Sequence, residues 1–190
     1  MKYQSGIKEL DTVLCGGFQK GTLSIVLGEG EMSGKTTTLT YLANNALDSG
    51  SNVAFISLEE DTDVLKGTIT NPYAKLVHLK PNTRFETLQM TISSLQPDLI
   101  FIDGLNQLEH FDFNPEAVSV LHNLRVYAMM CGKAVVAGVG VNPGHDVVRF
   151  LRMSDVALDI EDFYHKSFTL GVLKNTQGKA GMTINFGLSH

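Results

Sequence analysis

The 190-residue sequence has little cysteine, no long apolar run and no excess of positive charge. Its two cysteines, Cys15 and Cys131, form no CxxC pair and are too few for a disulfide framework. Its six histidines show no spacing typical of metal ligands, so we expect no structural metal. No apolar stretch approaches the ~20 residues that a membrane-spanning helix needs, and no signal-peptide stretch follows Lys2. We therefore expect a soluble, cytoplasmic protein with reduced cysteines and no membrane partner.

The charge balance is acidic, because 20 Asp and Glu outnumber 15 Lys and Arg and give a formal net charge of −5. Proteins that coat nucleic acid usually carry a broad positive field, so the balance counts against that class. It does not exclude a ring whose inner loops carry a few local cations. Hydrophobic residues make up 43% and charged residues 18%, which excludes a disordered or fibrous chain.

Short apolar runs alternate with amphipathic segments, without an internal repeat or linker, so we expect a single domain over residues 1–190. Strands are expected at 22–27, 52–58, 75–79, 98–103, 134–139, 155–160, 167–174 and 182–186. Helices are expected at 6–14, 35–48, 62–70, 84–95 and 115–130. Strands that are apolar throughout are typical of a parallel sheet covered on both faces. The pattern predicts an α/β fold with a mostly parallel central sheet flanked by helices, and antiparallel strands at its C-terminal end.

The segment 28–36 joins an expected strand to an expected helix and resembles a phosphate-binding loop of the form GxxxxGK[ST]. Lys35 would reach the β- and γ-phosphates of ATP, and the Thr36 hydroxyl would hold Mg²⁺. Glu29 stands where the motif has its first glycine, so an ordinary glycine turn is the alternative. The expected cofactors are ATP and Mg²⁺, and the candidate binding residues are Gly30, Glu31, Met32, Ser33, Gly34, Lys35, Thr36 and Thr37.

Two acids at strand ends are further candidates, because ligands of such sheets bind beyond the carboxyl ends of the strands. Asp103 ends an apolar strand, where it would complete the Mg²⁺ shell or, alternatively, begin a turn. Glu59 follows another strand and is our candidate for the general base that activates water. The alternative is that Glu59, Glu60 and Asp61 all complement the dipole of the following helix.

The order of these segments resembles RecA-like P-loop ATPases over about residues 5–186. The entry segment SGIKELDTVLCGGFQKG, residues 5–21, is similar to that of ATPases of the KaiC and RadA kind. Three further segments resemble DnaB-type replicative helicases. FISLEE at 55–60 is similar to their strand that ends in the catalytic glutamate, and IFIDGLN at 100–106 is similar to their Walker B strand. LKNTQGKAG at 173–181 resembles their C-terminal hairpin. The resemblance implies a RecA-like ATPase core that works as a homo-oligomeric ring or filament.

In such assemblies a basic residue of the C-terminal hairpin reaches the γ-phosphate of the next subunit. By position Lys174 matches the hairpin lysine, Thr176 stands where the helicases have an arginine finger, and Lys179 is a candidate substitute. Gly140 stands where the helicases have a polar sensor. Thr176 and Gly140 thus differ from the helicase pattern at the two positions where, in the helicases, the nucleotide state is coupled to DNA binding.

The segment 142–152 corresponds to a DNA-gripping loop, and a second candidate contact loop spans 106–114. The cationic candidates for DNA contact in 142–152 are His145, Arg149 and Arg152, and Phe150 would stack on a base. The alternative is an amphipathic helix packed on the core.

Two functions remain open at the level of sequence. The first is a helicase-type ATPase that couples hydrolysis to movement on single-stranded DNA. The second is an accessory or regulatory protein that binds ATP or ADP with little turnover, which Glu29, Gly140 and Thr176 favour.

Overall fold

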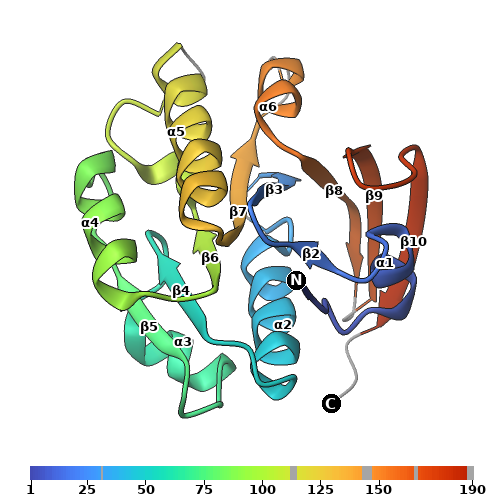
Figure 1. Ribbon diagram of the computed structural model, residues 1–190, viewed down its shortest axis with the longest axis horizontal. Helices are drawn as coiled ribbons and strands as arrows, with labels where there is room; N and C mark the ends of the chain where they lie inside the picture. Colours follow the sequence, from blue (N-terminus) through green and yellow to red (C-terminus); the bar gives the residue numbers. More distant parts are fainter. Residues whose placement is uncertain (31, 112–114, 143–146, 165–166, 188–190) are drawn as a thin grey trace.

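The computed structural model describes residues 1–30, 32–111, 115–142, 147–164 and 167–187, and its main feature is one eight-stranded sheet (Figure 1). The strand order is β10-β9-β8-β3-β7-β6-β4-β5. The strands are β3 (Thr22–Glu29), β4 (Val53–Ser57), β5 (Lys75–His78), β6 (Leu99–Asp103), β7 (Ala134–Val141), β8 (Val156–Tyr164), β9 (Ser167–Asn175) and β10 (Met182–Gly187). The α/β class with its mostly parallel sheet is confirmed.

Helices cover both faces of this sheet. They are α1 (Lys8–Val13), α2 (Lys35–Asp48), α3 (Thr62–Thr68), α4 (Phe85–Leu95), α5 (Pro115–Cys131) and α6 (Val148–Met153), with a short 3₁₀ helix at Leu105–Gln107. One apolar cluster joins α1, α2 and α3 to the sheet, and a second joins α4, α5 and α6 to it. Successive strand residues alternate between the clusters, as Phe101 and Ile102 do, which is why these strands are apolar throughout.

Strand direction decides which segments meet at each end of the sheet. β8 pairs in parallel with β3 and antiparallel with β9, and β9 pairs antiparallel with β10. The carboxyl ends of the parallel strands β3, β4, β6, β7 and β8 therefore lie at the same end of the sheet, which is called here the carboxyl edge. The loop between β9 and β10 lies at the other edge, called here the amino edge.

The structure adds elements that the sequence pattern did not predict. A two-stranded antiparallel ribbon joins β1 (Lys2–Tyr3) to β2 (Phe18–Gln19). Residues 148–153 form α6, which is the amphipathic-helix alternative for part of the proposed DNA-gripping loop. Within the described ranges, no helix is both long and apolar enough to cross a membrane.

The first testable prediction concerns the core between β4 and β6. Phe55 and Phe101 are fully buried, and their rings stack with centroids 6.2 Å apart. Phe101→Ala is expected to lower the free energy of unfolding by about 3–5 kcal/mol, because it leaves a cavity in a packed core. Urea unfolding measures this change, and Tyr73→Ala, at a side chain that is 85% exposed, is the control. A loss below about 1 kcal/mol for Phe101→Ala would contradict the packing described.

Candidate active site

The loop between β3 and α2 has the backbone that a phosphate-binding loop needs. Gly34 caps the N-terminus of α2 with φ of 80°, and Gly30 has φ of 75°, both in the left-handed region that favours glycine. A Cβ atom on Gly34 would also lie 2.9 Å from the ring of Phe163. The chain thus turns directly into the N-terminus of α2, which favours an anion.

Lys35 is the first residue of α2, directly after this loop. Its side chain is 4% exposed, and its Nζ donates to the carbonyl of Gly30 at 3.1 Å and to Oγ of Ser33 at 2.9 Å. The ammonium group is therefore held by acceptors whose place phosphate oxygens can take. Of the other predicted loop residues, Met32 is 92% exposed, Thr37 is half-buried on the first turn of α2, and Glu31 lies outside the described residues.

The structure brings Thr36 and Asp103 together, and their role as Mg²⁺ ligands stays a prediction. Oγ1 of Thr36 donates to Oδ2 of Asp103 at 2.9 Å, and Oγ of Ser57 donates to the same oxygen at 3.3 Å. Asp103 is fully buried, and its Oδ1 has no hydrogen-bond partner within the described part of the chain. A hydroxyl beside a carboxylate whose second oxygen is unsatisfied fits the oxygen ligands that Mg²⁺ prefers.

Burial, and then the nearby charge of Glu59, raise the pKa of Asp103 above its ordinary value, to about 6. The hydroxyls of Thr36 and Ser57 and the ammonium of Lys35 oppose this shift, but do not cancel it. A divalent cation beside Asp103 would favour the charged form and lower its pKa.

Glu59, two residues after the end of β4, lies beside Asp103 at the end of β6 because the two strands are neighbours. A Cβ atom on Gly104 would lie 2.5 Å from Cγ of Glu59, so the glycine leaves space for this side chain. Glu59 is exposed to solvent, which gives a water molecule access to its carboxylate. Its role as general base stays a prediction.

Asp61 lies at the N-terminus of the following helix, as in the alternative interpretation of the three acids 59–61. Its Oδ1 accepts from the amides of Asp63 at 2.9 Å and Val64 at 3.1 Å, so it caps the N-terminus of α3. These two hydrogen bonds lower the pKa of Asp61. The carbonyl of Glu60 is 2.9 Å from Nδ1 of His78.

The polar group beside Gly140 comes from another segment. The amide of Gly140, near the end of β7, donates to Oδ1 of Asn106 at 2.8 Å. Asn106 belongs to the 3₁₀ helix that follows β6, so its amide occupies the space that a side chain at position 140 would enter. The sequence analysis considered only the residue at position 140 itself, so it did not predict that Asn106 places a polar group there.

An acidic group that the sequence analysis also missed lies on β8, beside the phosphate loop. Burial raises the pKa of Asp159, and the charges of Glu161 and Glu29 raise it further. Because strand residues alternate between the two faces, Glu29 and Asp159 lie on the face that α4, α5 and α6 cover, and not on the face of α2. The neighbouring Phe163 stacks on Phe168 with ring centroids 4.5 Å apart.

Both candidates for contact with a neighbouring subunit lie toward the amino edge, across the sheet from the phosphate loop. Nζ of Lys174 donates to the carbonyl of Leu151 at 2.6 Å and also to those of Arg152 and Ser154. Burial, and then the charge of Arg125, lower the pKa of Lys174. Lys179 is exposed in the loop between β9 and β10. Neither lysine lies beside the phosphate loop of its own chain, and their roles stay predictions.

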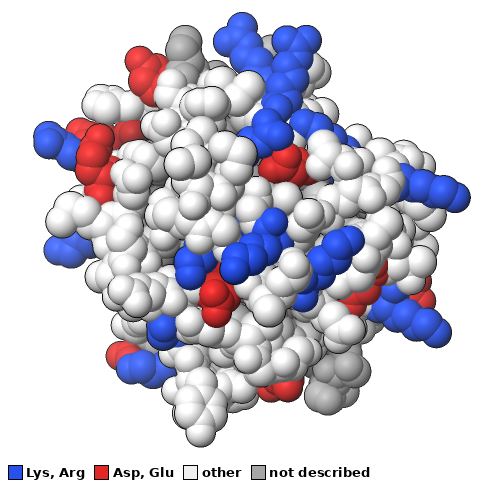
Figure 2. Space-filling model, in the orientation of Figure 1, with Lys and Arg blue, Asp and Glu red and all other residues white. Residues whose placement is uncertain are grey.

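The DNA-contact candidates are separated by the structure. Arg149 and Arg152 are exposed on α6, where Lys and Arg side chains gather at the top of the view in Figure 2. Phe150 is 1% exposed and packs against Phe111, so the expectation that it stacks on a base is wrong for this conformation. Its apolar ring is used in the core instead. His145 lies outside the described residues.

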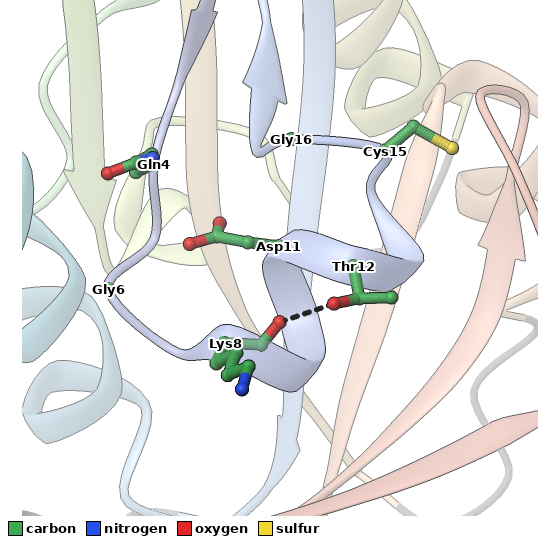
Figure 3. A pocket seen from close by; sticks show the side chains of 7 residues that line it. All are labelled: Gln4, Gly6, Lys8, Asp11, Thr12, Cys15 and Gly16. Carbon is green, nitrogen blue, oxygen red and sulfur yellow. Dashed lines mark hydrogen bonds between the residues drawn. The ribbon is translucent and has the colours of Figure 1, made fainter.

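An open pocket of about 590 Å³ lies beside α1, away from the phosphate loop (Figure 3). Its lining residues are Gln4, Gly6, Lys8, Asp11, Thr12, Cys15 and Gly16. Oδ1 of Asp11 accepts from the amide of Ser5 at 2.7 Å, and the carbonyl of Ser5 accepts from Asn45 of α2 at 3.0 Å. These contacts fix the entry segment to the C-terminal part of α2.

The raised pKa of Asp103 generates the second prediction. Between about pH 4 and pH 6 the folded chain keeps a proton on Asp103 that the unfolded chain has lost, so the stability contributed by this group falls as pH rises. In the Asp103→Asn variant the side chain at position 103 is neutral at every pH, so this dependence on pH is removed. The nucleotide-free variant is therefore expected to be more stable than wild type above pH 6, by up to about 3 kcal/mol, and similar near pH 4.

Chemical denaturation across this pH range measures the difference. Asp61→Asn is the control of opposite sign, because the pKa of Asp61 is lowered and its contribution is lost as pH falls. An Asp103→Asn variant that is less stable than wild type at neutral pH would contradict the assigned burial of an uncompensated charge.

Residues 3–91 match a family model described as "ATPase: KaiC". The chain is similar to the DNA repair protein RadA of Brucella abortus (strain 2308), at 32% identity over 145 residues, which covers 70% of this chain and 31% of the relative. It is also similar to RadA of Chlamydia pneumoniae, at 28% identity over 107 residues, covering 55% of this chain and 22% of the relative. RadA of Listeria monocytogenes is 27% identical over 121 residues, which cover 63% of this chain and 26% of the relative.

The matched part thus spans less than a third of the length of these relatives. The resemblance to DnaB-type helicases stays a prediction. The sheet, the loop before α2 and these similarities agree on one coarser assignment: the chain has the fold of a RecA-like P-loop NTPase, and it is similar to proteins of the KaiC and RadA kind.

Proposed function

We propose that this chain binds ATP with Mg²⁺ and hydrolyses it. The observation that carries the proposal is the meeting of Lys35, Thr36 and Asp103 at the carboxyl edge, with Glu59 beside them. Each of the four residues supplies one of the groups that phosphoryl transfer to water needs. The similarity to ATPases of the KaiC kind supports the same activity.

In this proposal the backbone N–H groups of the loop and the ammonium of Lys35 bind the β- and γ-phosphates. Thr36 and Asp103 would hold Mg²⁺, which would supply positive charge beside the phosphate oxygens. The carboxylate of Glu59 orients a water molecule and accepts one of its protons as the water oxygen attacks the γ-phosphorus. The products are ADP and inorganic phosphate.

We further propose that hydrolysis is coupled to single-stranded DNA, as in a helicase-type motor. The relatives are DNA repair proteins by name, and two exposed arginines, Arg149 and Arg152, lie together on α6. The lysines at the amino edge support an oligomer in which Lys174 or Lys179 contacts the nucleotide of a neighbouring subunit, since neither lies near its own phosphate loop.

An accessory role with little turnover is the second candidate. Glu29 stands where the phosphate-binding loop motif has its first glycine, which favours a site with weakened turnover. The ammonium of Lys174 is held by three carbonyls of its own chain, so a contact in trans would require it to leave them.

The third prediction tests hydrolysis directly. Glu59→Gln is expected to lower kcat for ATP by about 10²- to 10⁴-fold while the Kd for Mg-ATP stays within about twofold, because the amide cannot accept the proton. Lys35→Ala is expected to weaken nucleotide binding itself. Steady-state phosphate release and equilibrium nucleotide binding measure the two effects.

Glu60→Gln is the matched control, since Glu60 is the adjacent acid and its carbonyl contact with His78 is unaffected. Turnover that survives in Glu59→Gln would refute the base assignment. Saturable Mg-ATP binding without turnover in the wild type would favour the accessory role, and no nucleotide binding would refute both candidates.

The fourth prediction concerns DNA. The double variant Arg149→Glu, Arg152→Glu is expected to lose stimulation of hydrolysis by single-stranded DNA and to keep its DNA-independent rate. Two lost phosphate contacts should reduce the slope of log affinity against log salt by about 1.4. Fluorescence anisotropy with a labelled oligonucleotide measures the slope, and Lys66→Glu on α3 is the control. Unchanged stimulation would contradict DNA contact through α6.

A further inference from the structure

Ser57 is a buried serine at the end of β4 for which the proposed hydrolysis has no stated use. It is fully buried, and its neighbours across the sheet are Asp103 on β6 and His78 on β5. We propose that Ser57 is a positioning residue that ties the carboxylate of Asp103 to the backbone carrying Glu59. This inference rests on the proposed hydrolysis of ATP and adds how its base is held in place.

The hydroxyl of Ser57 uses its whole hydrogen-bonding capacity. It donates to Oδ2 of Asp103 at 3.3 Å, and it accepts from the amides of Glu59 at 3.1 Å and Glu60 at 2.8 Å. A serine hydroxyl has one proton to donate and two lone pairs to accept, so all three positions are filled. The hydroxyl oxygen of Ser57 thus connects Asp103, a proposed Mg²⁺ ligand, with the backbone of Glu59 and Glu60.

Other contacts hold the same turn on either side of Glu59. The amide of Leu58 donates to the carbonyl of Asp103 at 3.0 Å, and the carbonyl of Glu60 is 2.9 Å from Nδ1 of His78. The side chain of Glu59 itself rests against Gly104, the residue that follows Asp103. A displacement of Asp103 is therefore transmitted to Glu59 through its amide and its side chain.

The tie matters because Oδ2 of Asp103 is shared. Thr36 donates to this oxygen from the phosphate loop, and Ser57 donates to it from the turn of the base. A hydroxyl that binds Mg²⁺ through a lone pair keeps its proton, so Thr36 and Ser57 would both hold the Asp103 carboxylate beside the ion. A base misplaced by about 1 Å can cost about 10²-fold in rate, so fixing the turn has a large kinetic effect.

A purely structural role for Ser57 predicts different behaviour, and the chain offers a matched control. Ser24 on β3 is 1% exposed, and its Oγ has no hydrogen-bond partner among the residues that the structure describes. Ser57→Ala and Ser24→Ala thus remove the same atom from two buried strands, but only the first removes the tie to Asp103 and Glu59.

The fifth prediction is a double-mutant cycle measured by single-turnover ATP hydrolysis. Ser57→Ala is expected to lower the rate at least about tenfold, with the Kd for Mg-ATP within about twofold of wild type. In the Glu59→Gln background the same change is expected to alter the residual rate less than about twofold, because Ser57 acts through Glu59. Ser24→Ala is expected to leave the rate unchanged.

Amide hydrogen exchange tests the contact without reference to hydrolysis. In Ser57→Ala the amides of Glu59 and Glu60 are expected to exchange about tenfold faster, whereas Ser24→Ala leaves them unchanged. An unchanged rate in Ser57→Ala, or an equal loss in both backgrounds of the cycle, would overturn the inference and leave the proposed function standing. A wild-type chain without turnover would overturn the proposed function, and the exchange rates would still decide whether the tie exists.

Discussion

The buried carboxylate of Asp103 is the group on which the other contacts of the carboxyl edge depend. It ends a strand of the core, yet it accepts hydrogen bonds from Thr36 in α2 and Ser57 in β4. Its burial without full compensation raises its pKa to about 6, so the nucleotide-free fold keeps an electrostatic cost at this position. Sites that bind cations commonly carry such a cost in the empty state, because the ligand removes it.

Much of the fold could be predicted from the sequence because its strands are buried on both faces. The helix expected at 35–48 has those bounds in α2, since a glycine cap before Lys35 and the pair Ser49-Gly50 mark its ends. The ribbon of β1 and β2 was missed because two-residue strands have no periodicity. The order of strands was not predicted, because apolar runs show that strands are buried but not which of them pair.

The candidate site divides in the same way. Residues that carry a motif, such as Lys35 and Thr36, are recognisable at fixed spacing, and Asp103 joins them because carboxyl ends of parallel strands meet. Ser57 and Asp159 were missed, and Asn106 was assigned only to a candidate DNA-contact loop, since the contacts of all three come from the strands and loops beside them. Phe150 was misassigned because a sequence shows that a ring is present, but not that Phe111 covers it.

The position of β3 in the sheet also constrains how the chain reaches this structure. The strand that leads into the phosphate loop lies between β7 and β8, which begin at residues 134 and 156. During synthesis β3 therefore leaves the ribosome long before either of its partners, and its backbone groups stay unpaired until the second half of the chain follows. The loop between β3 and α2, although it precedes both partners of β3 in the sequence, is among the last parts to gain a fixed support, so folding is governed by pairings distant in sequence.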